Sequence, residues 1–250
     1  MKKFALALAL VLFVCATVPA LAASPTDVLG VWYLKSFEYY NSMASLEGDY
    51  KVEFNRDRSA LLVLNGTEMQ TTWDLRDNGA EIKMENGTET FELQEDGTLK
   101  AYLKIYDDNS WYCYFAREKE EIQIPALADA TSEEDYFGTY ALTLQKNGNL
   151  LQPVENGEAL LKIAIEFAQV TITGESLYST QPVMSDYQEG KVVIPAYGIV
   201  SGSTEENKLY IGKTETGIAV TTDVAPDMMY FLNPVNATET ADPAGTGTGE

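Results

Sequence analysis

Apolar and polar residues alternate with a period of two along most of the chain from about residue 24 onward. In the segment Tyr50–Phe54 (YKVEF) the apolar residues share one face and the charged residues share the other. The segment Leu99–Ile105 (LKAYLKI) alternates in the same way. No long helical periodicity interrupts this pattern, which therefore predicts an all-β protein with little helix rather than a parallel β-α-β sheet.

Turn signals divide the first half of the chain at intervals of about ten residues. Asn, Asp and Gly tolerate the left-handed backbone that tight hairpin turns require. These signals predict a meander of seven or eight short antiparallel strands, and they lie at Asn65-Gly66, Asp77-Asn78-Gly79, Asn86-Gly87, Asp96-Gly97 and Asp107-Asp108-Asn109.

The second half carries similar strand patterns, punctuated by glycines. Residues Glu155–Ile165 leave an alternative open, since Ala159-Leu160-Leu161-Lys162 has good helix propensity. The predicted strands are Ile163–Phe167, Val170–Thr173, Lys191–Ile194, Lys208–Ile211, Ile218–Thr222 and Tyr230–Leu232.

Two stretches 108 residues apart open alike, namely Asp27–Tyr33 (DVLGVWY) and Asp135–Tyr140 (DYFGTY). Each begins a run of strand-like segments, and the runs close on the aromatic segments Trp111–Phe115 and Met228–Leu232. A repeat on this scale predicts one small all-β fold used twice. The expected organisation is a first domain at 23–117, a linker at 118–132, a second domain at 133–235 and a disordered, acidic tail at 236–250.

Residues 1–22 have the pattern of a secretory signal peptide, which predicts an extracytoplasmic protein, secreted or at the cell surface. Lys2 and Lys3 precede an apolar stretch too short for a mature transmembrane helix, and small residues follow up to Ala22. Lipidation at Cys15 is the alternative, but it is disfavoured because Val14 is bulkier than the residue expected there. No integral membrane segment is expected after removal of the signal.

The amino-acid composition limits the kinds of catalytic, metal and binding sites that the chain can form. The chain has no histidine, which excludes imidazole metal sites, Ser-His-Asp and Cys-His catalysis and a histidine pH switch. Its formal net charge of −21 makes nucleic acid an unfavourable partner. After signal removal Cys113 is the one remaining thiol, and its apolar row predicts a buried small hydrophobe.

The Gly30-Val31-Trp32 opening, the antiparallel meander and the closing aromatic strand together resemble the small bacterial lipocalin-like, or calycin-type, domains. The resemblance implies two tandem small lipocalin-like β-barrels. It also implies that Trp32 plugs one barrel end and that Arg117 stacks on it, a structural contact worth roughly 1 kcal/mol. In the second domain Gly138 and Tyr140 take the matching positions, while Asn233-Pro234 stands where the basic residue is expected.

In full lipocalins the loop between the first two strands guards the cavity, so the resemblance implies a lid or rim at Tyr39–Gly48 and Lys146–Glu158. The apolar residues there can equally be barrel plugs with no cavity beneath. The candidate ligand-binding residues are Tyr39, Tyr40, Met43, Leu46, Leu150 and Leu151.

Other groups have simpler structural explanations. Tyr33, Tyr102, Tyr112 and Tyr114 decorate the outside of a barrel if the opposite, apolar rows fill it, and they line a cleft if the rows are reversed. The acidic clusters at Asp107-Asp108 and Glu133–Asp135 lack the ligand spacing of a calcium loop.

These observations favour a non-enzymatic exported protein that binds a small apolar ligand, a glycan or another protein at a barrel mouth or at the seam between domains, with no cofactor, metal or catalytic residue. One alternative is a structural or interaction module with solid barrels. A hydrolase that works through two carboxylates is less favoured, because nothing in the sequence selects the pair.

Overall fold

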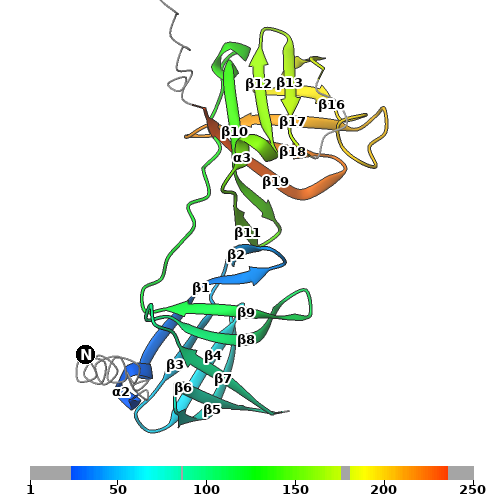
Figure 1. The fold of residues 1–250 in the computed structure, drawn as a ribbon. Coiled ribbons are helices and arrows are strands. Elements are labelled where there is room, and N and C mark those ends of the chain that lie inside the picture. The colour runs from blue at the N-terminus through cyan, green and yellow to red at the C-terminus, as the bar shows by residue number, and fades with distance from the viewer. Residues whose placement is uncertain (1–23, 86, 176–180, 236–250) are drawn as a thin grey trace, which may run out of the picture. The chain divides into compact units, whose positions relative to one another are not determined.

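The structure is a computed structural model that describes residues 24–85, 87–175 and 181–235. The predicted signal segment, Asn86 of one predicted turn and the predicted tail lie outside the described residues. Within the described ranges nearly all regular structure is β-strand, as the alternation predicts (Figure 1). The chain forms two compact units: unit 1 takes in residues up to Lys35 and Asp49–Lys119, and unit 2 takes in Ser36–Gly48 and the residues from Glu120 onward.

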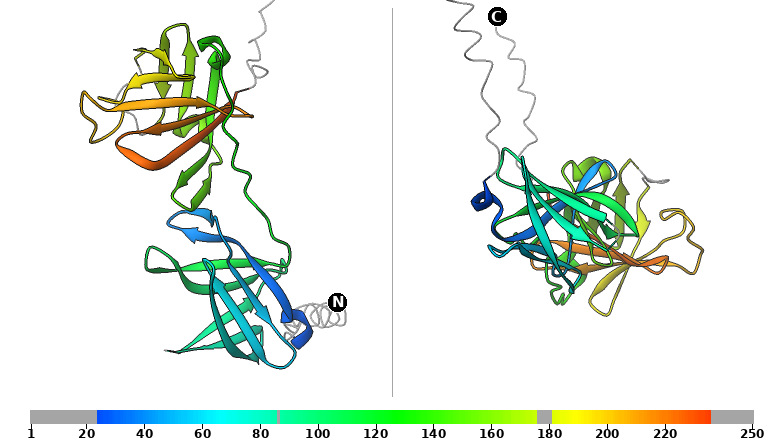
Figure 2. Two further views of the ribbon diagram at one scale, coloured as in Figure 1. Left: turned by 180° about the vertical axis from the view of Figure 1, so that it is seen from behind. Right: turned by 90° about the horizontal axis from the view of Figure 1, so that it is seen from below.

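Unit 1 is an antiparallel meander in which the first part of β1 pairs with β3 and each later strand pairs with the next (Figures 1 and 2). A single helical turn, α2 (Pro25–Val28), precedes β1. The strands are β1 (Gly30–Tyr39), β3 (Lys51–Phe54), β4 (Ser59–Leu64), β5 (Thr67–Arg76), β6 (Gly79–Met84), β7 (Gly87–Leu93), β8 (Leu99–Tyr106) and β9 (Asn109–Ala116).

The turn chemistry of unit 1 is the one that its sequence predicts. Asn65 and Gly66, between β4 and β5, have φ values of 51° and 75°. Asp107 and Asp108, between β8 and β9, have φ values of 54° and 57°. Two successive residues with positive φ match the right-handed twist of a hairpin, so these turns fix the register of the strands that they join.

Aromatic rings fill the interior of unit 1. Phe54 packs edge-on against both Trp73 and Phe91, with centroid separations of 5.5 Å in each case. Phe91 in turn lies 5.8 Å from Phe115, and all four side chains are buried. Each ring buries a large apolar area, so this cluster supplies much of the packing that a domain without a disulfide needs.

Unit 2 contains a closed antiparallel barrel. Its strands pair in the circular order β10, β12, β13, β14/β15, β16, β17, β18, β19 and back to β10, with β14 and β15 separated only by Ser185. The bounds are β10 (Gly138–Asn147), β12 (Lys162–Glu166), β13 (Gln169–Thr173), β14 (Val183–Met184), β15 (Asp186–Gln188), β16 (Lys191–Pro195), β17 (Lys208–Lys213), β18 (Ile218–Thr222) and β19 (Ala225–Pro234).

All six strands predicted for the second half are present, with ends that differ by a few residues. The helical alternative at Glu155–Ile165 is right only in part. A four-residue helix, α3 (Gly157–Leu160), is followed directly by β12 from Lys162. A 3-10 turn, η1 (Glu133–Tyr136), precedes β10.

The repeat seen in the sequence extends to local structure at the same spacing. The helical turns Pro25–Val28 and Glu133–Tyr136 lie 108 positions apart, and so do the strands β1 and β10. Trp32 donates its Nε1–H to the carbonyl of Val28 at 2.8 Å. Tyr140 donates its hydroxyl to the matching carbonyl, that of Tyr136, at 3.0 Å. We call residues 24–32 and 132–140 the plug segments.

A basic side chain lies over each plug aromatic. The predicted contact is present in unit 1, where the Arg117 guanidinium lies 3.6 Å from the centroid of the Trp32 ring. Arg117 also donates to the carbonyls of Asp27 and Leu29 at 2.7 and 2.5 Å. In unit 2 the cation is Lys213 from β17, which donates to the carbonyl of Asp135 at 2.7 Å and lies 5.8 Å from the centroid of the Tyr140 ring.

Candidate ligand pocket

The barrel of unit 2 holds an apolar pocket of about 300 Å³, and no residue of the plug segment 132–140 lines it. Inward-facing aliphatic side chains from five strands form its wall: Leu142 of β10, Ile163 of β12, Ile172 of β13, Leu209 of β17 and Val220 of β18. Alternation along each strand aims these side chains at the barrel axis. They are aliphatic, whereas the interior of unit 1 is filled by large rings, and branched side chains leave space that rings would occupy.

Two segments outside the strands cover this pocket. Leu160 and Leu161, at the end of α3, contribute one side of the cover. Residues Ile199–Ser201, from the connection between β16 and β17, contribute the other. The volume is at the lower end of the range for small-molecule sites.

A β-bulge adds a polar pair to the lining. Leu142 pairs with Leu232 and Leu144 pairs with Phe231, so β10 has one extra residue, Thr143, at this point. The extra residue reverses the alternation, because a bulge re-aims the side chains that follow it. Leu144 therefore joins a separate cluster with Phe231, while Gln145 lines the pocket directly opposite its cross-strand partner Tyr230.

Close backbone contacts fix α3 against the barrel. A Cβ at Gly157 would lie 1.6 Å from the carbonyl oxygen of Leu142, and a Cβ at Gly174 would lie 2.2 Å from that of Leu160. Only glycine fits at such distances. The amide of Leu142 donates to the carbonyl of Leu161 at 3.0 Å, which ties β10 to the residue after α3. The cover that α3 provides is thus part of the packed structure.

The pocket lining is electrically neutral among the residues that the structure describes. Its polar groups are the side chains of Gln145, Ser201 and Tyr230. Burial raises the pKa of the Tyr230 hydroxyl above its ordinary value. Leu160 also borders an adjacent open depression that carries two carboxylates, those of Glu158 and Glu175.

The six residues predicted to bind ligand lie elsewhere. Tyr39, Tyr40 and Met43 belong to the hairpin of β1 and β2 (Ser42–Leu46), where Tyr40 and Met43 are exposed. Leu46, Leu150 and Leu151 are buried. None of the six is among the residues that line the pocket of unit 2, so a ligand-binding role for them stays a prediction.

Within unit 2 the hairpin of Ser36–Gly48 pairs with β11 (Leu150–Pro153). Leu46 lies opposite Leu150, and Ser45 lies opposite Leu151. The pairing is extended by the Glu47 amide, which donates to the carbonyl of Asn149 at 2.8 Å, and by an ion pair between Lys146 and Glu47. Leu46, Leu150 and Leu151 therefore hold a sheet together.

The tyrosines on β8 and β9 face outward. Tyr102 and Tyr112 are cross-strand partners, about half exposed, with ring centroids 4.9 Å apart. The apolar row on the opposite side of these strands, including Leu103, is buried. The reading in which these rings decorate the outside is therefore the one that the structure adopts.

The two acidic clusters have structural roles in backbone hydrogen bonding and in a turn. The carboxylate of Asp135 accepts from the amides of Thr131 and Ser132 at 2.7 and 3.2 Å, and these hydrogen bonds lower its pKa. Asp107 and Asp108 form the turn described above. Among the described residues no group of three or more His, Cys, Asp or Glu side chains is placed to hold a metal ion.

Cys113 is fully buried on β9, as predicted for a small hydrophobe. Burial raises the pKa of its thiol to about 12. A thiol with so high a pKa forms little nucleophilic thiolate at neutral pH.

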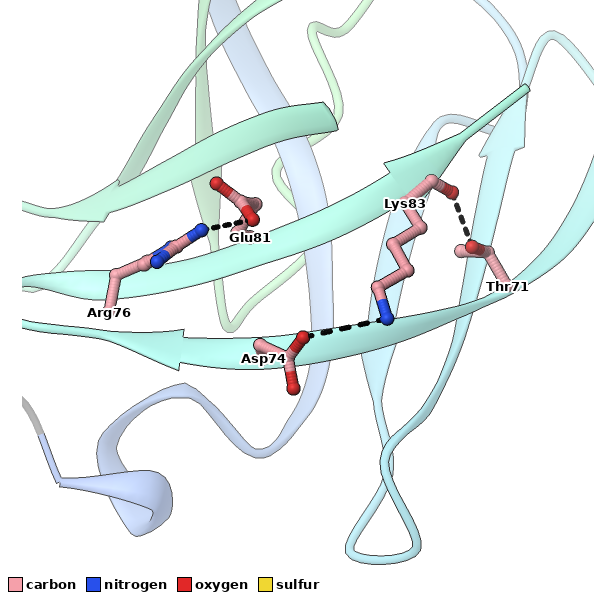
Figure 3. Close-up of polar contacts among 5 residues, drawn as sticks. All are labelled: Thr71, Asp74, Arg76, Glu81 and Lys83. Carbon is pink, nitrogen blue, oxygen red and sulfur yellow. Dashed lines mark hydrogen bonds and ion pairs between the residues drawn. The ribbon is translucent and has the colours of Figure 1, made fainter. Parts of the chain in front are cut away.

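A ladder of charged and polar side chains covers the outer face of β5 and β6 (Figure 3). Lys83 lies 3.7 Å from Asp74 across the two strands, and Arg76 pairs with Glu81. These groups are largely exposed, except for Glu81. Exposed pairs of this kind contribute little free energy, so the ladder favours the register of the two strands and forms no site.

No protein-family model, curated protein or solved structure matches this chain. In the part of the chain that the structure describes, none of the helices has the length and apolar character needed to cross a bilayer.

Proposed function

We propose that this protein is an exported, non-enzymatic binding protein that takes a small apolar ligand into the pocket of unit 2. One observation carries the proposal, namely a cavity of about 300 Å³ with aliphatic walls and a few convergent polar groups. That combination is the usual character of a small-molecule site. When a ligand covers apolar surface that is unfilled inside a domain, the free energy of the complex falls.

We further propose that both units are lipocalin-like barrels, with unit 1 as a support and unit 2 as the carrier. The repeated plug segments favour a common ancestry of the units, since helical turn, glycine and hydrogen-bonded aromatic ring recur at the same spacing of 108 residues. The aromatic cluster of Phe54, Trp73, Phe91 and Phe115 favours a packed interior in unit 1.

Export from a bacterial cytoplasm is proposed from residues 1–22, because their pattern is typical of a signal peptide. The strongly acidic chain favours neutral or cationic partners over nucleic acid and anionic surfaces. A glycan or a protein partner on another surface is the alternative, in which the barrels act as an interaction module.

Calorimetric titration of the protein with 1-decanol separates these proposals. The 1-decanol molecule has about eleven non-hydrogen atoms. A 300 Å³ space holds roughly ten water volumes, so the probe matches the pocket in size. A dissociation constant of about 10–100 μM is expected from ordinary ligand efficiency. The interaction-module alternative predicts no heat of binding.

Two variants test whether the ligand binds in the pocket of unit 2. Val220→Trp fills the pocket from its wall, and Ser201→Trp blocks it from an exposed loop position that does not disturb the core. Each is expected to weaken binding at least about tenfold. Thr221→Trp is the matched control, because Thr221 neighbours Val220 on β18 but does not line the pocket. Equal affinity in all three variants would refute the assignment.

A further inference from the structure

The pocket of unit 2 combines aliphatic walls with a single polar pair. Among its twelve described lining residues none is charged. The side chains of Gln145 and Tyr230 come from directly opposed positions on β10 and β19, so both polar groups lie on one wall. The other polar side chain, that of Ser201, stands at an exposed position of the cover.

We infer that the ligand is an electrically neutral, mainly aliphatic molecule with one hydrogen-bonding group, which lies against Gln145 and Tyr230. This inference rests on the proposed function and names the ligand class for that same pocket. An aliphatic alcohol, ester or amide has the required chemistry.

An ion is disfavoured by the lining. A carboxylate or ammonium group that enters this pocket leaves water and meets no described side chain of opposite charge. An anion is further opposed by the carboxylates of Glu158 and Glu175 in the adjacent depression, which shares Leu160 with the pocket. The net charge of −21 acts in the same direction.

The polar pair suits a neutral group. The Gln145 amide can both donate and accept a hydrogen bond. The Tyr230 hydroxyl stays protonated at neutral pH, since burial raises its pKa, and it can therefore donate to an alcohol or carbonyl oxygen. The bulge at Thr143 is what turns Gln145 toward this wall, so the polarity of the site is built into the strand pairing.

The test is calorimetric titration of the full chain at pH 8 with four straight-chain probes: 1-decanol, methyl decanoate, decanoate and decylammonium. Their unbranched alkyl chains differ by no more than one carbon, and the last two probes are ionised at this pH. We expect 1-decanol and methyl decanoate to bind, and both ions to bind at least about tenfold more weakly. Decanoate or decylammonium binding as tightly as 1-decanol would overturn the inference and leave the proposed function standing. Absence of binding by all four probes would instead remove the proposed function, and this inference with it.

A conservative variant tests the role of the polar wall. Tyr230→Phe removes only the hydroxyl, and we expect it to weaken 1-decanol binding about fivefold. Tyr197→Phe is the control, because Tyr197 is exposed and does not line the pocket. Retention of full affinity by Tyr230→Phe and by Gln145→Leu would show that the ligand's polar group lies elsewhere.

Discussion

Trp32 and Tyr140 stand 108 positions apart, and each donates a side-chain hydrogen bond to the carbonyl oxygen four residues earlier, at 2.8 and 3.0 Å. Each carbonyl belongs to a single helical turn that precedes the strand of its own unit. The indole and the phenol thus close the same local loop with different donors. This shared geometry is the strongest physical evidence for the repeat in the sequence.

The first prediction concerns the cation over Trp32. Arg117→Ala should destabilise unit 1 by about 1–3 kcal/mol, because it removes two charge-assisted hydrogen bonds and a cation–π contact. Urea unfolding followed by tryptophan fluorescence measures the change, since all three tryptophans lie in unit 1.

Two companion variants sharpen this test. Arg117→Lys keeps the charge but has one ammonium in place of the guanidinium fork, so an intermediate loss is expected. Arg56→Ala removes an exposed arginine of the same unit and should change stability by less than about 0.5 kcal/mol. An equal effect of Arg56→Ala and Arg117→Ala would contradict the structural role of Arg117.

The second prediction concerns Gly157. A Cβ at this position would lie 1.6 Å from a backbone oxygen of β10, so Gly157→Ala should push α3 away from the barrel and cost more than about 2 kcal/mol. Gly212→Ala is the control, because the nearest atom there lies 3.9 Å from the added Cβ. Thermal unfolding by circular dichroism compares the two, and similar melting temperatures would count against the close packing of α3.

The third prediction concerns pH. Hydrogen bonds from Thr131 and Ser132 lower the pKa of Asp135 in the folded state, so its contribution to stability is fully present above its ordinary pKa of about 3.9. That contribution is lost as the pH falls through the lower folded-state pKa. Asp135→Asn should therefore be less stable than the parent protein at pH 7, and the difference should shrink toward pH 2.

Asp129→Asn serves as the control for this experiment, since it makes the same change of charge on an exposed residue of the same unit. Chemical denaturation across the pH range gives both curves. A stability difference between parent and Asp135→Asn that is constant with pH would argue against stabilising hydrogen bonds to an ionised Asp135 carboxylate.

The fourth prediction concerns Cys113. With a fully buried thiol whose pKa is about 12, the native protein should resist iodoacetamide for hours at pH 8 and react promptly in denaturant. Peptide mass spectrometry locates the modification on Cys113. Rapid alkylation of this residue in the native state would mean that β9 opens readily.

Much of the fold follows from local pattern, because alternation, turn chemistry and the closing aromatic strands are local properties. The strands Lys191–Pro195 and Ile218–Thr222 are recognisable by their apolar runs. The four-residue strand Leu150–Pro153 forms a local hairpin with β10, but its second partner, β2, lies about a hundred residues away and cannot be read from local pattern.

The pocket was less accessible to sequence reasoning for two physical reasons. Strict alternation from Tyr140 and Leu142 places Gln145 on the outside, and only the bulge at Thr143 reverses it. The cover by Ile199–Ser201 depends on how the connection between β16 and β17 folds back over the barrel. The substitution of Lys213 for the missing basic residue at the end of β19 is likewise a tertiary effect.

Native mass spectrometry of the protein purified from its source tests the carrier role most directly. We expect a bound neutral species that dissociates on mild activation, is absent from Ser201→Trp and is retained by Thr221→Trp. A protein that emerges with no adduct, under conditions that keep it folded, would contradict carriage of a ligand in the barrel of unit 2.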